Sequence, residues 1–194
     1  MRAFVALAPP PAVRARLSDL RDRLAMACPA GAVRWVKDHQ LHLTLVFLNE
    51  ISAAQAEAVS SGLAEIARAW PPLGLGVRGL GMFPDAKRLR VVWAGVGGDV
   101  AGLGGLQAAV SAMCAAAAGY VPEHRDYHPH FTLGRVRDEV DGIVRGMIGA
   151  TVRLGSPVNG PTWVQTTITL YRSELKPGGA EHSVVWQGDF TGPG

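Results

Sequence analysis

The tetrapeptide His-apolar-Thr-Leu occurs twice in this chain, and each copy lies in a segment with the composition of a β-strand. The first copy spans residues 42–45 and the second spans residues 130–133, 88 residues further along. Successive side chains of a strand project from opposite faces, so the histidine and threonine of each copy share one face and the apolar residues share the other. Each strand therefore presents an imidazole beside a hydroxyl on an otherwise apolar element.

Strand-like and helix-like segments follow one another in a similar order around the two motifs. Hydrophobic periodicity predicts helices over 11–27, 52–70 with Ser52 as N-cap, within 97–119 with Gly119 as the end, and 138–150. It predicts strands over 2–8, 33–36, 41–48, 73–83, 88–96, 130–136, 162–175 and 183–190. We therefore predict an α+β fold in which residues 1–194 form a single domain of two pseudo-symmetric lobes, one from each half of the chain. Each lobe is expected to be an antiparallel sheet with helices outside, with a cleft between the lobes.

Composition sets broad limits on what the protein is. The chain is 48% hydrophobic and 18% charged, which is typical of a folded protein with a sizeable core. Its net charge of +3 is compatible with an anionic substrate, and the densest basic run, 85–90, is expected to be a solvated loop. We expect no apolar run as long as the roughly 18–20 residues that cross a bilayer, and no signal peptide, so a cytoplasmic location is predicted.

Two imidazoles on opposite sides of one cleft suit displacement at phosphorus. Histidine titrates near neutrality, so one ring can take a proton from the attacking oxygen while the other gives a proton to the leaving oxygen. The hydroxyls of Thr44 and Thr132 can donate hydrogen bonds to the non-bridging oxygens. A lone strand histidine is more often structural, but the pairing of His42 with His130 favours catalysis.

Other kinds of site fit the sequence less well. No carboxylate or cysteine lies at ligand spacing around either motif, so no metal is expected, and no G-x-S-x-G elbow indicates a serine hydrolase. The glycine cluster before residue 106 lacks the lysine of a phosphate-binding loop and predicts a turn and helix cap. For several other residues the sequence predicts no part in a functional site. Cys28 and Cys114 are expected to be buried free thiols, and Trp35, Trp93 and Trp163 are expected to be core residues. His39, His124 and His128 are expected to lie exposed on the surface.

The two motifs and their surroundings resemble the 2H phosphoesterases, and within them the bacterial and archaeal RNA 2′,3′-cyclic phosphodiesterases first described as 2′-5′ RNA ligases. The similarity extends over nearly the whole chain, through "MRAFVAL", "VRWVKDHQLHLTLVFLNE", "GLGMFPDAKRLRVVWAGV", "HPHFTLGRVR" and "LYRSELKPGG". It implies that His42 and His130 are the catalytic histidines. It also implies that Thr44, Thr132 and Arg135 contact the substrate phosphate.

Two positions depart from this pattern or from regular strand geometry. Arg135 follows His130 by five residues, which is the wrong parity for the same strand face, although Gly134 permits a bulge or a strand end that turns the arginine inward. After "KPGG" the family often has an aromatic residue such as tyrosine, and His182 lies near that place in this chain. The contribution of this loop to substrate contact is therefore left open.

The resemblance implies a metal-independent hydrolase without cofactors. Water would attack the phosphorus of an RNA 2′,3′-cyclic phosphate end, the 3′-oxygen would leave, and a 2′-phosphomonoester would remain. The subgroup suggests His130 as base and His42 as acid, an assignment that the symmetry of the motifs leaves open. A 5′-hydroxyl RNA end in place of water would give a 2′-5′ linkage.

Partners and rival activities follow from the same resemblance. The expected partners are RNA ends, including tRNA fragments, with no membrane, and the protein is expected to be a monomer. One alternative is the same chemistry on a small cyclic nucleotide or ADP-ribose cyclic phosphate. The other is a non-catalytic RNA-binding module.

Overall fold

The computed structural model describes residues 1–122, 126–156, 158–176 and 179–193. Its strands are β1 (Arg2–Leu7), β2 (Val33–Trp35), β3 (Leu43–Glu50), β4 (Leu73–Phe83), β5 (Val91–Gly98), β6 (His130–Val136), β7 (Asn159–Gln165), β8 (Thr167–Lys176) and β9 (Gly179–Asp189). Its helices are α1 (Pro11–Ala27), α2 (Ala53–Ala69), α3 (Val100–Ala118) and α4 (Gly142–Leu154), with a 3₁₀ turn, η1, over Asp38–Gln40.

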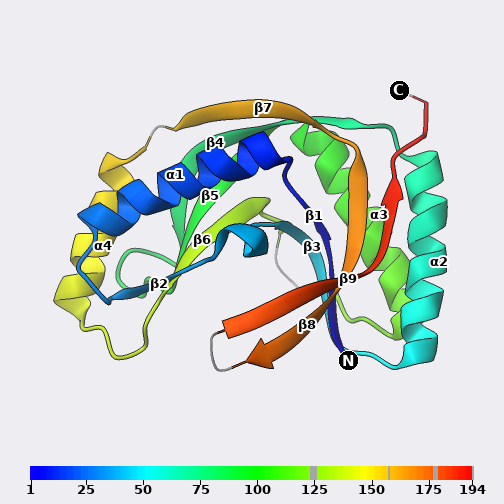
Figure 1. The fold of residues 1–194 in the computed structure, drawn as a ribbon, viewed down its shortest axis with the longest axis horizontal. Coiled ribbons are helices and arrows are strands. Elements are labelled where there is room, and N and C mark those ends of the chain that lie inside the picture. Colours follow the sequence, from blue (N-terminus) through cyan, green and yellow to red (C-terminus); the bar gives the residue numbers. More distant parts are fainter. Residues whose placement is uncertain (123–125, 157, 177–178, 194) are drawn as a thin grey trace.

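The strands form one curled antiparallel sheet in the order β7-β4-β5-β6-β3-β1-β8-β9, with β2 also paired to β6 (Figure 1). Helices α1 and α4 cover the part that contains β6, and α2 with α3 cover the part that contains β3. We call these two parts the β6 half (β2, β4, β5, β6, β7) and the β3 half (β1, β3, β8, β9). They meet where Leu43 of β3 pairs with Phe131 of β6. The predicted α+β class, with antiparallel strands and helices outside, is confirmed.

The two halves of the sheet are not the two halves of the sequence. The β6 half takes β4, β5 and β7 from both sides of the chain's midpoint, and the β3 half takes β8 and β9 from the C-terminal end. Helix α1 directly follows β1 yet packs against β2, β6 and β7 on the other half. Chain segments thus cross between the halves, and the two His-x-Thr strands are neighbours within one sheet.

Most element boundaries agree with the sequence-based prediction. Helix α1 and strands β4 and β6 match the predicted ranges, and Ser52 is the N-cap of α2. The Ser52 hydroxyl accepts from the Gln55 N–H at 3.2 Å, and the Gln55 side chain accepts from the Ser52 N–H at 2.8 Å, which forms a capping box. Gly119 ends α3 with a left-handed φ of 69°.

Several boundaries differ from the prediction: β9 begins at Gly179 rather than at residue 183, and β5 begins at Val91 rather than at residue 88. Two further differences have a clear physical reason. The segment 162–175, predicted as one strand, is divided at Thr166 between β7, which pairs with β4, and β8, which pairs with β1 and β9. Because alternation of apolar residues continues through the division, periodicity could not reveal it. Helix α4 begins at Gly142 rather than at residue 138 because Asp141 is its N-cap, and its carboxylate accepts from the Val144 N–H at 2.9 Å.

Helix α3 also corrects an expectation, since its apolar stretch is longer than we judged from the sequence. Among the described residues it is the one helix that is long and apolar enough to cross a membrane by length and composition, with a mean hydropathy of 1.5. One side of it is packed against α2 and β3 in this fold, with Leu103, Leu106, Val110 and Cys114 fully buried. This helix therefore supplies the core beneath β3.

Candidate active site

Strands β3 and β6 bring the two His-x-Thr motifs together at the middle of the sheet. Leu43 is the partner of Phe131, and both side chains are buried in the core, 0% and 1% exposed. Extending this antiparallel register by one residue in each direction sets the histidine of each motif opposite the threonine of the other. Directly opposite residues project from the same face with Cβ atoms about 4.5–5.5 Å apart. The four predicted side chains thus form a compact group, all half-buried, on the face away from the core.

A β-bulge follows the threonine in β6 and explains the position of Arg135. Leu133 is the bulged residue, because its two neighbours pair with consecutive residues of β5. The bulge shifts the alternation by one, so that Val136 is buried while Arg135 is exposed on the histidine face. Of the two possibilities that the sequence left open, a bulge or a strand end, the structure shows a bulge, at Leu133 beside Gly134. A Cβ on Gly134 would lie 2.6 Å from the Val33 side chain on the paired strand β2, so any larger residue would force its neighbours to shift.

Strand β3 carries the same irregularity after its own motif. Leu45 is the extra residue relative to β1, and it is buried together with the next residue, Val46. Phe47 consequently lies on the histidine face, 49% exposed, with its ring 5.9 Å from that of Phe4. It occupies the position that corresponds to Arg135 in the second motif. Strict strand alternation had placed Phe47 on the apolar face with Leu41, Leu43 and Leu45. That prediction was wrong, because the extra residue Leu45 shifts the alternation by one.

Each motif histidine is held by a backbone carbonyl two residues earlier. The Nδ1–H of His42 donates to the Gln40 oxygen at 2.7 Å, and the Nδ1–H of His130 donates to the His128 oxygen at 2.7 Å. A carbonyl oxygen can only accept, so these bonds place the proton of the neutral ring on Nδ1. The Nε2 atom of each ring is then the one that can exchange a proton with a substrate.

Aromatic rings surround His42 on the β3 half. Its ring centroid lies 4.7 Å from that of Phe4 and 5.4 Å from that of His182, which stands edge-on to it. Tyr171 of β8 stacks on Phe4 at 5.1 Å. His182, which our sequence reasoning singled out only as a departure from the family pattern, is therefore a direct neighbour of the first motif histidine.

A second group of rings lies beside His130 on the β6 half. The His130 ring is 5.0 Å from Phe83 and 6.1 Å from Trp93, and Trp93 is in turn 4.7 Å from His128. The prediction of a core role was wrong for Trp93, because its strand neighbour Gly81 has no side chain and the half-buried indole lies over it. The other two tryptophans with this prediction pack against the core as expected.

The electrostatic environment makes His42 a weak base in the free protein. Burial, followed by the neighbouring charges of His182, Arg135 and His130, lowers the pKa of His42 to about 4, against the opposing hydrogen bond to Gln40. The ring is therefore neutral at pH 7. A bound phosphate anion raises the pKa of such a ring, because an opposite charge stabilises the protonated form.

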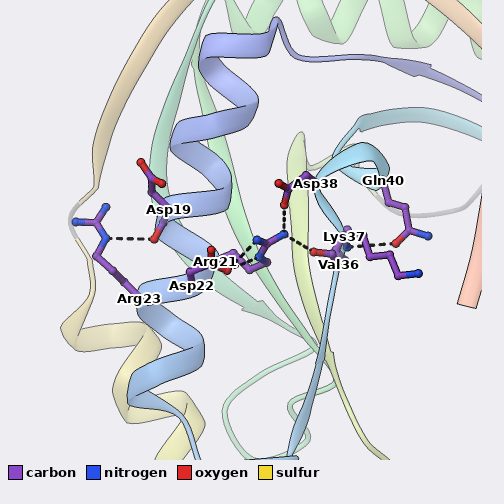
Figure 2. Close-up of polar contacts among 8 residues, drawn as sticks. All are labelled: Asp19, Arg21, Asp22, Arg23, Val36, Lys37, Asp38 and Gln40. Carbon is purple, nitrogen blue, oxygen red and sulfur yellow. Dashed lines mark hydrogen bonds and ion pairs between the residues drawn. The ribbon is translucent and has the colours of Figure 1, made fainter. Parts of the chain in front are cut away.

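The turn before β3 is fixed by helix α1 (Figure 2). Arg21, whose side chain is 12% exposed, donates to the Val36 oxygen at 2.7 Å and to the Asp38 carboxylate at 2.6 Å. The Lys37 N–H donates to the Gln40 side chain at 3.2 Å, and Gln40 supplies the carbonyl that orients the first motif histidine. The sequence analysis left residues 37–40 unassigned between two predicted strands and missed this arginine.

The remaining predictions concern exposure and metal ligands. His39 and His128 are exposed as predicted, whereas His124 lies outside the described residues. Cys28 and Cys114 are buried free thiols as predicted, and burial raises the pKa of both. In the described part of the chain, no group of three or more His, Cys, Asp or Glu residues has the arrangement of a metal site.

The sequence is similar to known phosphoesterases. Residues 7–93 match the family described as LigT like Phosphoesterase. An RNA 2′,3′-cyclic phosphodiesterase of Methanothermobacter thermautotrophicus is 30% identical over 184 residues, which cover 92% of this chain and 93% of that protein. One from Aeropyrum pernix is 36% identical over 122 residues, which cover 63% of this chain and 66% of the relative, slightly less than two thirds of its length.

Solved structures show the same architecture. The crystal structure of TT0787 of Thermus thermophilus superposes with a TM-score of 0.82 at 29% identity, covering 99% of both chains. That of Escherichia coli LigT complexed with 3′-AMP gives a TM-score of 0.75 at 27% identity, covering 98% of both chains. With two paired His-x-Thr strands in this fold and near full-length similarity to these proteins, the chain belongs to the LigT-like phosphoesterase family of the 2H superfamily.

Proposed function

We propose that this protein hydrolyses 2′,3′-cyclic phosphate ends of RNA to 2′-phosphomonoester ends, with His42 and His130 as the acid–base pair. One observation carries most of the weight. Both rings are tied at Nδ1 to a carbonyl, at 2.7 Å in each case, and they lie on adjoining strands, so each would exchange its proton with the substrate through Nε2. The relatives are named RNA 2′,3′-cyclic phosphodiesterase, and this activity needs an acid and a base placed as His42 and His130 are.

The proton transfers follow from the position of a phosphate between the two rings. One Nε2 takes a proton from water as the water oxygen bonds to phosphorus, and the other gives a proton to the 3′-oxygen as its bond to phosphorus breaks. The 2′-oxygen stays bonded, which leaves a 2′-phosphomonoester. With the base assigned to His130, as the resemblance suggests, His42 must take up its proton when the substrate anion binds.

The other predicted residues hold the phosphoryl group. The hydroxyls of Thr44 and Thr132 donate hydrogen bonds to its non-bridging oxygens, where negative charge accumulates in the transition state. Arg135, which the bulge in β6 turns onto the same face, adds a positive charge near these oxygens. Its charge also lowers the pKa of His42.

RNA ends, tRNA fragments among them, are the proposed substrates, acted on by a monomer in the cytoplasm. The test is incubation of a cyclic-phosphate-ended oligonucleotide with the protein in EDTA, followed by identification of the new end. We expect a 2′-phosphate and no effect of EDTA, because the chemistry needs only the two imidazoles. A 3′-phosphate product, or activity that returns only with a divalent ion, would contradict the mechanism. A nucleoside 2′,3′-cyclic phosphate and ADP-ribose cyclic phosphate assayed in parallel measure the preference for RNA.

A further inference from the structure

Strands β3 and β6 share one pair of residues in their ladder, Leu43 with Phe131, and this junction positions the two motifs relative to each other. On its other edge β3 pairs with β1 along most of its length, and β6 pairs with β5 along most of its own. The contact between the motif strands is thus much shorter than the contacts on their outer edges. Side chains that bridge this short junction therefore help to fix where the first motif lies relative to the second.

Tyr127 bridges the junction by a hydrogen bond. It lies in the segment that leads into β6, shortly before His130, and its hydroxyl donates to the Thr44 carbonyl oxygen at 3.1 Å. Its half-buried ring packs against the core, and burial raises the pKa of the hydroxyl. The hydroxyl therefore stays protonated and remains a donor throughout the pH range in which histidines titrate. The bond ties the threonine of the first motif to the approach to the second.

The Thr44 carbonyl lies where the backbone of β3 is irregular. The extra residue Leu45 follows it, and the Leu45 carbonyl accepts from the Gln107 side chain of α3 at 3.4 Å. Buried backbone carbonyls need a donor, and at these two positions side chains supply one. The bulge in β6 is held by backbone instead, since the Leu133 oxygen accepts from the Val36 N–H at 2.9 Å. The first motif thus relies on side-chain donors where the second uses the main chain.

The direction of the Thr44 hydroxyl depends on the backbone that carries it. A β-branched side chain has few accessible χ1 rotamers, so its hydroxyl turns with the backbone instead of adjusting independently. Groups that stabilise a transition state must be held within about 0.5 Å of the productive geometry. Thr44 lies opposite His130 in the extended register, so a small rotation of its peptide would move its hydroxyl relative to a phosphoryl group beside that ring.

We propose that Tyr127 is a positioning residue of the site, whose hydroxyl, through the Thr44 carbonyl, holds the Thr44 side chain in line with the phosphoryl oxygens. This inference rests on the proposed function and gives a role in it to a residue outside both motifs. Thr132 does not depend on Tyr127, because its backbone is held by pairing with Trp93 of β5. A phenylalanine at position 127 would fill almost the same volume and would leave the Thr44 carbonyl without this donor.

The test is a pair of double-variant cycles assayed on the cyclic-phosphate oligonucleotide. Tyr127→Phe should lower kcat by about three- to tenfold with little change in KM, because it loosens a group that acts in the transition state. The same change should have almost no further effect in Thr44→Ala, which has no hydroxyl to position, and its full effect in Thr132→Ala. Tyr120→Phe, which alters another half-buried tyrosine that packs against the core, is the matched control and should leave kcat unchanged. Equal losses in the two threonine backgrounds, or no loss from Tyr127→Phe alone, would overturn the proposal.

NMR of threonine methyl groups decides the same question without turnover. The signals of Thr44 and Thr132 are assigned as those missing from the spectra of Thr44→Ala and Thr132→Ala. In Tyr127→Phe the Thr44 signal should shift or broaden while the Thr132 signal stays in place. Two unchanged signals, or two signals that change alike, would overturn the proposal. A wild type that does not hydrolyse the cyclic phosphate overturns the proposed function itself, and the methyl signals then still decide whether Tyr127 positions Thr44.

Discussion

Leu43 and Phe131 pair across antiparallel strands β3 and β6, and this contact joins the two halves of the sheet. Because both side chains point into the core, the residues on either side of them point out of it on one common face. The arrangement of the proposed catalytic residues is thus set by backbone register. Both histidines are positioned by paired strands and not by loops.

Removing either motif histidine should abolish most of the activity. His42→Ala and His130→Ala should each lower kcat by a factor on the order of 10²–10⁴, because each removes one proton transfer. The double variant should lose far less than the product of the two factors, since both rings act in one step. Circular dichroism checks the fold, and His39→Ala, which changes an exposed histidine, is the control. Near-wild-type turnover in a single variant would remove that histidine from the mechanism.

The lowered pKa of His42 makes stability depend on pH. The ring titrates at about 4 in the folded protein and near its ordinary value of about 6.5 when unfolded. Between these values the unfolded chain binds a proton that the folded chain does not, so the free energy of unfolding falls as the pH drops from about 6.5 to 4. The full effect is on the order of 3 kcal/mol.

Urea unfolding at pH 7 and pH 4 measures this effect, with His42→Gln as the comparison. The wild type should lose more free energy of unfolding than the variant over that interval. An NMR titration of the His42 ring should show a pKa that rises when inorganic phosphate is added. A free-protein pKa near 6.5 would contradict the buried environment described here.

The threonines should affect the height of the pH–rate profile and leave its shape intact. Wild-type kcat/KM should follow a bell whose two limbs belong to the coupled histidine pair. Thr44→Ala or Thr132→Ala removes a hydrogen bond to the phosphoryl group and should cost about 1.5–3 kcal/mol of transition-state stabilisation. Neither change removes a titrating group, so the limbs should stay in place. A shifted limb in either variant would show that the hydroxyl acts on a histidine instead.

The bulge in β6 should be sensitive to a single methyl group. Gly134→Ala places a Cβ 2.6 Å from Val33, so we expect a loss of about 1–3 kcal/mol in the free energy of unfolding and lower kcat/KM as Arg135 moves. Gly146→Ala is the matched control. Its Cβ meets nothing within 4 Å in the interior of α4, so it should raise the free energy of unfolding by about 0.5–1 kcal/mol. Equal effects of the two substitutions would argue against the close approach of Val33 to Gly134.

Arg21 should act on catalysis through the turn that carries Gln40. Arg21→Ala leaves the Val36 oxygen and the Asp38 carboxylate without their donor, so we expect kcat to fall and the limb of the pH profile that depends on His42 to shift. Arg21→Lys should restore part of both. Arg23→Ala, on the same helix but exposed, is the control. Loss of stability with an unshifted pH profile would mean that Arg21 is structural only.

Local sequence determined a large part of this fold. Helix ends are set by residues next to them in the chain. Ser52, with Gln55, and Asp141 cap the N-termini of α2 and α4 through hydrogen bonds to nearby N–H groups. Gly119 ends α3 through its left-handed backbone angle. The repeated His-x-Thr alternation likewise fixed which residues share a strand face. The wrong parity of Arg135 for a regular strand also indicated either a bulge or a strand end near Gly134, and the structure has a bulge at Leu133.

Tertiary structure decided which segments meet. The sequence suggested that each half of the chain makes its own lobe, but strand pairing over long separations joins β8 and β9 to β1 and sends α1 to the opposite half. Periodicity describes only the face that a residue occupies and not its partner strand, so it could not show this. For the same reason His182, Arg21 and Phe47 went unrecognised. Each reaches the site through a pairing, a helix contact or a bulge that exists only once distant parts of the chain have packed together.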